Sequence, residues 1–234
     1  MEKIKEEVPE KLRIAVLLSF ISGYINAFTY NNAGELFAGA QTGNVIFMAL
    51  HFAKGNLEKA VEFLIPIISF MMGQIFIYCF RNFFQRRGHK GYIHSSLLML
   101  FIMIVLIIFL PFFDYHFIVV TLAFFAAIQS DTFQRLRGFS YATIMMTGNV
   151  KNAPRLLIEG LVQRDRELLV RGFLLFLIIF SFMLGVGIST YFTQFVKKSA
   201  LVPLILPLSY INYVLFKEEH SVIDVVKSKI RKIK

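Results

Sequence analysis

Apolar residues run in long blocks along most of this chain, and polar residues are concentrated in the gaps between them. A membrane-spanning helix needs about 20 mostly apolar residues, because the hydrocarbon layer is about 30 Å thick. Six blocks meet this requirement, at about 14–33, 60–80, 93–113, 116–134, 172–196 and 199–216. Two shorter apolar stretches, about 36–53 and 139–154, contain Gly and polar residues. The pattern predicts an all-α integral membrane protein with six transmembrane helices and two short re-entrant or broken segments.

Basic residues indicate how the two broken stretches are threaded, because cytoplasmic loops carry an excess of Lys and Arg. If both stretches crossed the membrane, the basic loops at 81–90 and 135–137 would lie outside. If both return to the side they entered, nearly all loop Lys and Arg lie inside, with both termini cytoplasmic. This arrangement also explains most of the net charge of +10. We therefore expect the lipid bilayer as a partner, and no nucleic acid.

The tetrapeptide Thr-Gly-Asn-Val occurs in both broken stretches, at 42–45 and again 105 residues later at 147–150. Further along, SFMMG at 69–73 matches SFMLG at 181–185. Two matches in the same order indicate an internal repeat. Three spans separate the copies, so the second copy would be inserted upside down, as an inverted 3+3 repeat. We predict an N-terminal cytoplasmic segment (1–13), a first membrane repeat (14–113), an inverted second repeat (114–216) and a basic cytoplasmic tail (217–234).

An inverted repeat would bring the two polar tetrapeptides together near the middle of the membrane. Irregular backbone at that depth is tolerated where protein or water surrounds it, so we predict that the tips line a site for a small solute. The predicted contacts are Thr42, Gly43, Asn44, Thr147, Gly148 and Asn149, with Tyr24, Asn26, Gln41, Gln129 and Asp131 as walls. The alternative is helix packing, because Gly39 and Gly43 have a Gly-x-x-x-Gly spacing.

Asp131 is the acidic residue that this pattern places well within a span. It would carry a coupling proton or cation, or it would pair with Arg135 one helical turn away. The single cysteine, Cys79, excludes an intramolecular disulfide, and the five His residues show no metal-ligand spacing. No nucleophile elbow, phosphate loop or dinucleotide motif occurs. We expect no metal, no cofactor and no enzymatic activity.

The segments SGYINAFTYNNAGELFAGAQTGNV (22–45) and AAIQSDTFQRLRGFSYATIMMTGNV (126–150) resemble the YoaK family of bacterial membrane proteins, a family of unknown function. The resemblance extends over about residues 13–216 and implies a six-span protein of the bacterial inner membrane. Asn26 stands where many relatives have Asp, and Ser130 and Asp131 stand where Asn-Ala is more usual.

These observations predict a small inverted-repeat transporter or channel for a small polar or anionic solute. Two alternatives from other classes stay open: a membrane scaffold that transports nothing, and a membrane-embedded enzyme acting on a lipid-soluble substrate. The sequence also leaves open whether the chain forms a homodimer.

Overall fold

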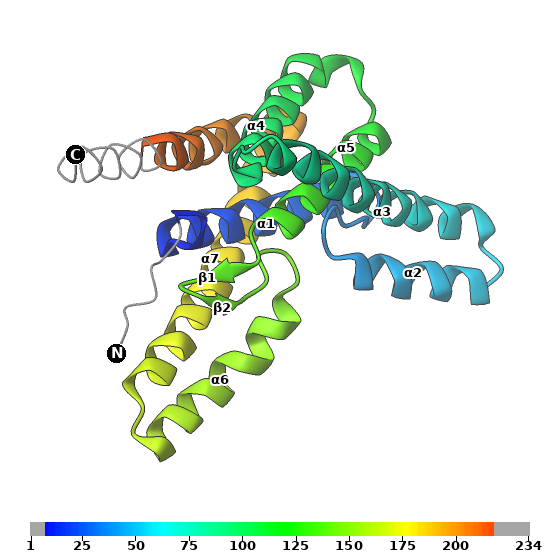
Figure 1. Ribbon diagram of the computed structural model, residues 1–234. Helices are drawn as coiled ribbons and strands as arrows, with labels where there is room; N and C mark the ends of the chain where they lie inside the picture. Colours follow the sequence, from blue (N-terminus) through cyan, green and yellow to red (C-terminus); the bar gives the residue numbers. More distant parts are fainter. Residues whose placement is uncertain (1–7, 218–234) are drawn as a thin grey trace.

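The computed structural model describes residues 8–217, which are almost entirely helical (Figure 1). The α-helices are α1 (Leu12–Asn32), α2 (Gln41–Ala53), α3 (Leu57–Arg86), α4 (Gly91–Phe109), α5 (Tyr115–Thr132), α6 (Met146–Gln163) and α7 (Arg166–Val196). Short 3-10 helices are η1 (Val8–Glu10), η2 (Leu110–Phe112) and η3 (Lys197–Leu204), and residues 205–217 after η3 are α-helical. A two-stranded antiparallel hairpin, β1 (Arg135–Leu136) and β2 (Phe139–Ser140), lies between α5 and α6.

Within the described residues, four helical segments are long and apolar enough to cross a membrane: Leu12–Asn32, Leu57–Arg86, Gly91–Phe112 and Arg166–Lys217. The predicted class, a helical membrane protein, is therefore confirmed at this level. The predicted number of six spans is not. The predicted span at 116–134 is the 18-residue α5, and the one at 199–216 is part of the 52-residue segment Arg166–Lys217, which includes α7 and η3. The predicted basic tail (217–234) lies outside the described residues except for Lys217.

Polar residues before three of the long helices explain where those helices begin. The Asn56 side chain accepts a hydrogen bond from the Lys59 N–H (3.3 Å) at the start of α3. The Asp114 carboxylate accepts one from the Phe117 N–H (2.8 Å) in the first turn of α5. Asp165 caps α7 in the same way. Such side chains satisfy backbone N–H groups that have no partner inside the helix.

Helices α1 and α7 pack in parallel, and small residues allow them to approach closely. Ser181 donates to the Val16 carbonyl (2.7 Å), and a Cβ placed on Gly185 would lie 2.1 Å from the Phe20 carbonyl oxygen. Helices α3 and α5 pack in the same manner. There Ser69 donates to the Val120 carbonyl (2.7 Å), and a Cβ on Gly73 would lie 3.1 Å from the Phe124 carbonyl oxygen.

The two matching pentapeptides therefore make matching contacts. Each uses its Ser and its Gly to hold the helix that begins the other half of the chain. Small residues four positions apart form a flat face that lets another helix approach to backbone contact. Gln74 adds a bond from its Nε2 to the Ala127 carbonyl (3.1 Å), so it connects α3 and α5.

Helices α1 and α5 cross in the centre of the molecule and run antiparallel (Figure 1). Gln129 of α5 bonds to Leu18 and Ser22 of α1. The earlier α5 residue Ala126 lies near Gly39, which bonds to the later α1 residue Asn26. The contacts therefore run in opposite order along the two helices. Two helical hairpins, α2 with α3 and α6 with α7, extend from this centre in different directions (Figure 1). The ends of α1 and α5 therefore point to opposite ends of the molecule.

Candidate functional site

Each Thr-Gly-Asn-Val copy lies in the first turns of a helix, where a linker folds back into the protein. We call residues 37–44 the first tip and residues 142–149 the second tip. In the first tip, the buried Asn44 amide binds the backbone seven residues earlier. Its Oδ1 accepts from the Phe37 N–H (2.9 Å), and its Nδ2 donates to the Phe37 carbonyl (2.8 Å) and to Gln41 Oε1 (2.8 Å).

The second tip repeats this arrangement. Asn149 Oδ1 accepts from the Ala142 N–H (3.2 Å), and Nδ2 donates to the Ala142 carbonyl (2.7 Å). Its second contact is Met146 Sδ (3.5 Å), at the position that matches Gln41. Both amides therefore act as clamps that close a tight loop before a helix. Neither amide is directed at open space in this conformation, although both were predicted to contact a solute.

Polar residues near the end of α1 hold the first tip in place. Asn26 Oδ1 accepts from the Gly39 N–H (2.9 Å) and the Ala40 N–H (3.0 Å), and Nδ2 donates to the Ser22 carbonyl (2.8 Å). The Thr29 hydroxyl accepts from the Ala38 N–H (3.1 Å). An oxygen at this position satisfies the backbone donors that precede α2, in the way that a capping residue does.

Asp131 stands 105 residues after Asn26 but has a different partner. Arg81 of α3 donates through Nη1 to Asp131 Oδ2 (2.6 Å) and to the Asp131 carbonyl (2.8 Å). The predicted pair with Arg135 was therefore wrong in its partner, although an ion pair does form. Asp131 also lies at the end of α5, one residue before its last, and not well within a span as predicted.

The two tips meet through their linkers. A Cβ placed on Gly39 would lie 2.5 Å from Ile144 Cγ2, and these two positions are 105 residues apart. The same Cβ would be 3.2 Å from the Asn26 amide nitrogen, so a larger residue here is crowded mainly by the Ile144 side chain. A Cβ on Gly43 would lie 2.8 Å from the Phe37 ring. Both glycines thus allow close packing within the tips, whereas a Cβ on Gly148 would meet no atom within 4 Å.

The other predicted contacts divide into exposed and buried groups. Thr42, Thr147 and Gly148 are exposed at the starts of α2 and α6. Gln41 is half-buried and bonds within the first tip, to the Ala38 carbonyl (2.8 Å). Tyr24 is buried away from the tips and donates to the Ala200 carbonyl (2.5 Å). Gln129 is fully buried between α1 and α5, where it donates to Leu18 and Ser22.

Two cavities lie beside the ends of α1 and α5. The first, of about 430 Å³, lies between α1, the first tip, α2 and α7. It is lined by Asn26, Ala27, Tyr30, Asn31, Phe37, Ala40, Phe47, Phe182, Val186 and Thr190. Most of these side chains are apolar, and Asn31 donates to the Thr190 hydroxyl (3.1 Å). We call it the apolar cavity.

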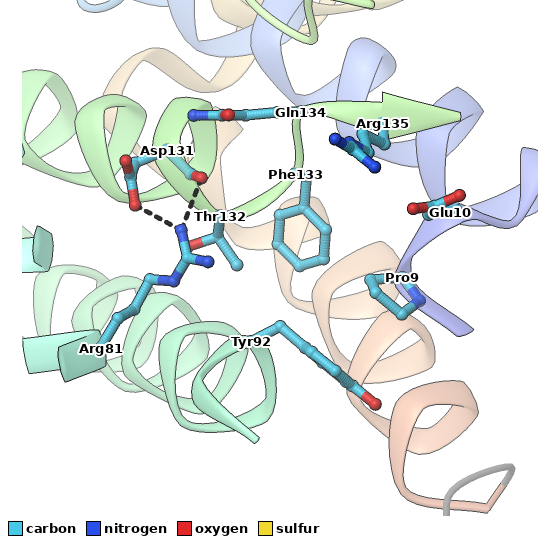
Figure 2. A pocket seen from close by; sticks show the side chains of 9 residues that line it. All are labelled: Pro9, Glu10, Arg81, Tyr92, Asp131, Thr132, Phe133, Gln134 and Arg135. Carbon is cyan, nitrogen blue, oxygen red and sulfur yellow. Dashed lines mark hydrogen bonds and ion pairs between the residues drawn. The ribbon is translucent and has the colours of Figure 1, made fainter. Parts of the chain in front are cut away.

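The second cavity, of about 190 Å³, lies at the end of α5 and has a polar lining (Figure 2). It is lined by Pro9, Glu10, Arg81, Tyr92, Asp131, Thr132, Phe133, Gln134 and Arg135. In Figure 2, Arg81, Asp131 and Thr132 are grouped on one side, and Glu10 and Arg135 lie on the opposite side. We call it the polar cavity. Asn26 and Asp131, which occupy matching positions, line one cavity each.

Sequence reasoning missed two polar residues of these cavities, Arg81 and Thr190. Arg81 was interpreted as a loop residue that marks the cytoplasmic side, but α3 continues to Arg86. The signal was present, because Arg81 follows an apolar run and is itself followed closely by Phe83 and Phe84. Thr190 gives no distinct pattern in one sequence, whereas Thr132 belongs to a group of polar residues, 129–132, inside an apolar block.

The long apolar helices and the apolar outer surface define a helical membrane protein. Within that class, the chain belongs to the family described as "Protein of unknown function (DUF1275)", whose sequence model matches residues 14–213. The YoaK family, which the sequence resembles, is a DUF1275 family. No curated protein and no solved structure matches this chain.

Proposed function

We propose that this protein is a small membrane transporter or channel with an inverted 3+3 repeat, which passes a small polar or anionic solute between its two cavities. The observation that carries the proposal is the position of the cavities. They lie at the opposite-pointing ends of α1 and α5, with matching residues Asn26 and Asp131 in their linings. Between them the two tips touch at Gly39 and Ile144.

The matching contacts of the two halves support the inverted repeat. Ser69 and Gly73 hold α5, and Ser181 and Gly185 hold α1, at corresponding places along each helix. Because α1 and α5 run antiparallel, a two-fold axis that exchanges the halves would lie in the membrane plane. In transporters with such repeats, solute sites lie near the midplane where the halves meet. Both termini are cytoplasmic in this proposal, and the membrane is a bacterial inner membrane.

The tips provide the polar surface of the proposed route. The exposed Thr42 and Thr147 hydroxyls lie at the starts of α2 and α6, where a helix carries partial positive charge. Such groups suit a solute that accepts hydrogen bonds. Asn44 and Asn149 have a different task in this proposal, because their amides keep each tip in shape for solute contact.

The tips must separate for solute to pass, because Ala38, Ala126 and Ile144 are all buried where they meet. The same packing favours the alternative class, a membrane scaffold that transports nothing. The two candidate functions therefore differ in one physical respect: whether the contact between Gly39 and Ile144 opens.

A reversible cross-link at this contact tests the proposal. In a Cys79→Ser background, Gly39→Cys and Ile144→Cys place two sulfurs within reach of a disulfide, which requires Cβ atoms about 4 Å apart. Proteoliposomes would be loaded with labelled acetate, phosphate or glycerol. We expect flux of at least one probe through the reduced protein, loss of that flux on oxidation and recovery on reduction.

The Ile144→Cys single variant is the matched control, and oxidation should leave its flux unchanged. Gly39→Cys alone is not used, because its Cβ would lie 2.5 Å from Ile144 Cγ2. Flux that continues through the fully cross-linked protein would show that the route does not pass between the tips. Absence of flux of all probes in the folded, reduced protein would favour the scaffold.

A further inference from the structure

The polar cavity at the end of α5 is one end of the proposed route, and its charged groups have no role assigned so far. It lies beside η1 and the last turns of α3 and α5, away from the contact between the tips. Charged groups are concentrated in it, since Arg81, Arg135, Asp131 and Glu10 all line a space of about 190 Å³. A space of this size holds a few water molecules, at roughly 30 Å³ each, or one small ion.

The two carboxylates of the cavity already have partners. Asp131 Oδ2 accepts from Arg81 (2.6 Å), and Glu10 Oε2 accepts from the Gly138 N–H (2.7 Å). The Glu10 backbone carbonyl also accepts from the Arg137 N–H (3.1 Å), which fixes η1 against the β1–β2 hairpin. These contacts reduce the capacity of the carboxylates to attract a cation into the cavity.

In contrast, two donor groups of the cavity have no hydrogen-bond partner. Arg81 uses Nη1 for both of its bonds to Asp131, while its Nε is buried and has no partner. The Thr132 hydroxyl is also buried, in a side chain that is 9% exposed, and Oγ1 has no partner. A buried donor without an acceptor costs about 1 to 3 kcal/mol, so a ligand that supplies acceptors gains by binding here.

We propose that the polar cavity binds a small oxoanion, a carboxylate or a phosphate group, through the guanidinium of Arg81 and the hydroxyl of Thr132. The guanidinium presents N–H groups in a planar fork that matches two oxygens of such an anion. Arg135, on the opposite side of the cavity, adds a second positive charge (Figure 2). The proposal concerns binding alone and does not require that the protein transports its ligand.

The Arg81–Asp131 ion pair allows a test in which removing one charged side chain is expected to increase the affinity for the anion. Asp131 competes with the ligand for the guanidinium, so Asp131→Asn should strengthen anion binding by at least threefold. Arg81→Gln should weaken it by at least tenfold, and Thr132→Val, which keeps the shape and removes the hydroxyl, by about fivefold. Arg87→Gln is the matched control. Arg87 lies at the end of the same helix but stacks on the exposed Phe83 ring, 3.7 Å from its centroid.

The experiment is isothermal titration calorimetry on the purified full chain in a neutral detergent, with acetate and inorganic phosphate at constant ionic strength. A second arm offers phosphatidylglycerol or phosphatidylcholine in mixed micelles, which distinguishes a lipid headgroup from a soluble anion. Saturable binding of acetate or phosphate identifies a soluble anion. Saturable binding of phosphatidylglycerol alone identifies an anionic headgroup. Both results support the oxoanion site if the variants behave as stated.

Three outcomes would overturn the proposal. The first is that the folded wild-type protein binds no probe in a saturable manner. The second is that Asp131→Asn weakens binding as much as Arg81→Gln, because the ion pair would then only maintain the structure. The third is that Arg87→Gln has the same effect as Arg81→Gln, which would indicate attraction by general surface charge. If Arg81→Gln fails to fold, Thr132→Val and Asp131→Asn still decide, because they must change affinity in opposite directions.

Discussion

At the scale of single residues, the side-chain amide of asparagine carries both an acceptor and donors. It can therefore bond to the N–H and the carbonyl of one backbone residue, as another backbone segment would. Asn44 and Asn149 both do this, with the N–H and the carbonyl of the residue seven positions earlier. The sequence revealed that the two residues are equivalent, because the tetrapeptide is repeated. It could not reveal where each amide points, since a ligand contact and a backbone contact need the same side chain.

Asn44→Leu and Asn149→Leu should each lower stability markedly, because the backbone N–H and carbonyl that the amide binds lose their partner. Because these backbone groups are only part-buried, the loss is about 1 to 3 kcal/mol per variant. The measurement is thermal unfolding of the purified protein in detergent. Thr42→Val and Thr147→Val change exposed hydroxyls in the same tetrapeptides and should leave the melting temperature nearly unchanged. Equal melting temperatures for the Leu and Val variants would contradict the clamp.

Asp131 shows a second limit at this scale. Sequence spacing identifies neighbours one helical turn away, and Arg135 stood at that distance. The helix ends at Thr132, however, so the turn that would have carried Arg135 to the carboxylate does not form. The observed partner, Arg81, is 50 residues earlier in the chain, and only the packing of α3 against α5 brings the two together.

At the scale of elements, hydrophobic patterning predicted most helices and several of their interruptions, but not the short strands between α5 and α6. The starts of α2 and α6 agree with the predicted broken segments, because Gly and polar residues in an apolar stretch weaken a continuous helix. The β1–β2 hairpin was missed, since strands of two residues are too short to show a period. The break at η3 agrees with the gap between the predicted spans 172–196 and 199–216, because α7 ends at Val196. It lies at Lys197, a non-glycine residue with φ of 47°.

Helix α7 offers a matched pair of glycines two residues apart. A Cβ on Gly185 would lie 2.1 Å from the Phe20 carbonyl oxygen, whereas a Cβ on Gly187 would meet no atom within 4 Å. Gly185→Ala should therefore push α7 away from α1 and destabilise the fold by about 1 to 3 kcal/mol or more. Gly187→Ala should be neutral or stabilising by about 0.5 to 1 kcal/mol, because alanine favours the helix. Melting temperatures of the two variants in one detergent measure the difference, and similar values would refute the packing argument.

At the scale of the whole molecule, the two halves are interlocked rather than placed side by side. The long helix of each half packs on the first helix of the other, α7 on α1 and α3 on α5. The sequence predicted the repeat from two short matches, but it gave no sign of this exchange. Similar sequence segments indicate which elements correspond, but they do not predict which elements are in contact.

Site-directed labelling tests the inverted arrangement. The chain has a single cysteine, so Cys79→Ser provides a background without thiols. Lys54→Cys lies in the turn between α2 and α3, and Gln163→Cys lies at the corresponding turn between α6 and α7; both positions are exposed. A membrane-impermeant maleimide should label Lys54→Cys in intact cells and Gln163→Cys only in inverted membranes. Labelling of both positions from the same side would exclude the inverted repeat.

The interlocking of the halves also has a consequence for how the protein is made. Helix α1 leaves the ribosome before α7, which covers it and begins only at Arg166. At about 5 to 20 residues per second, α1 waits roughly ten to thirty seconds for α7, with Gly23 facing lipid or the insertion machinery. During that interval the α1 face that packs on α7 needs another partner, so correct insertion of α1 depends on a helix that is synthesised more than 130 residues later.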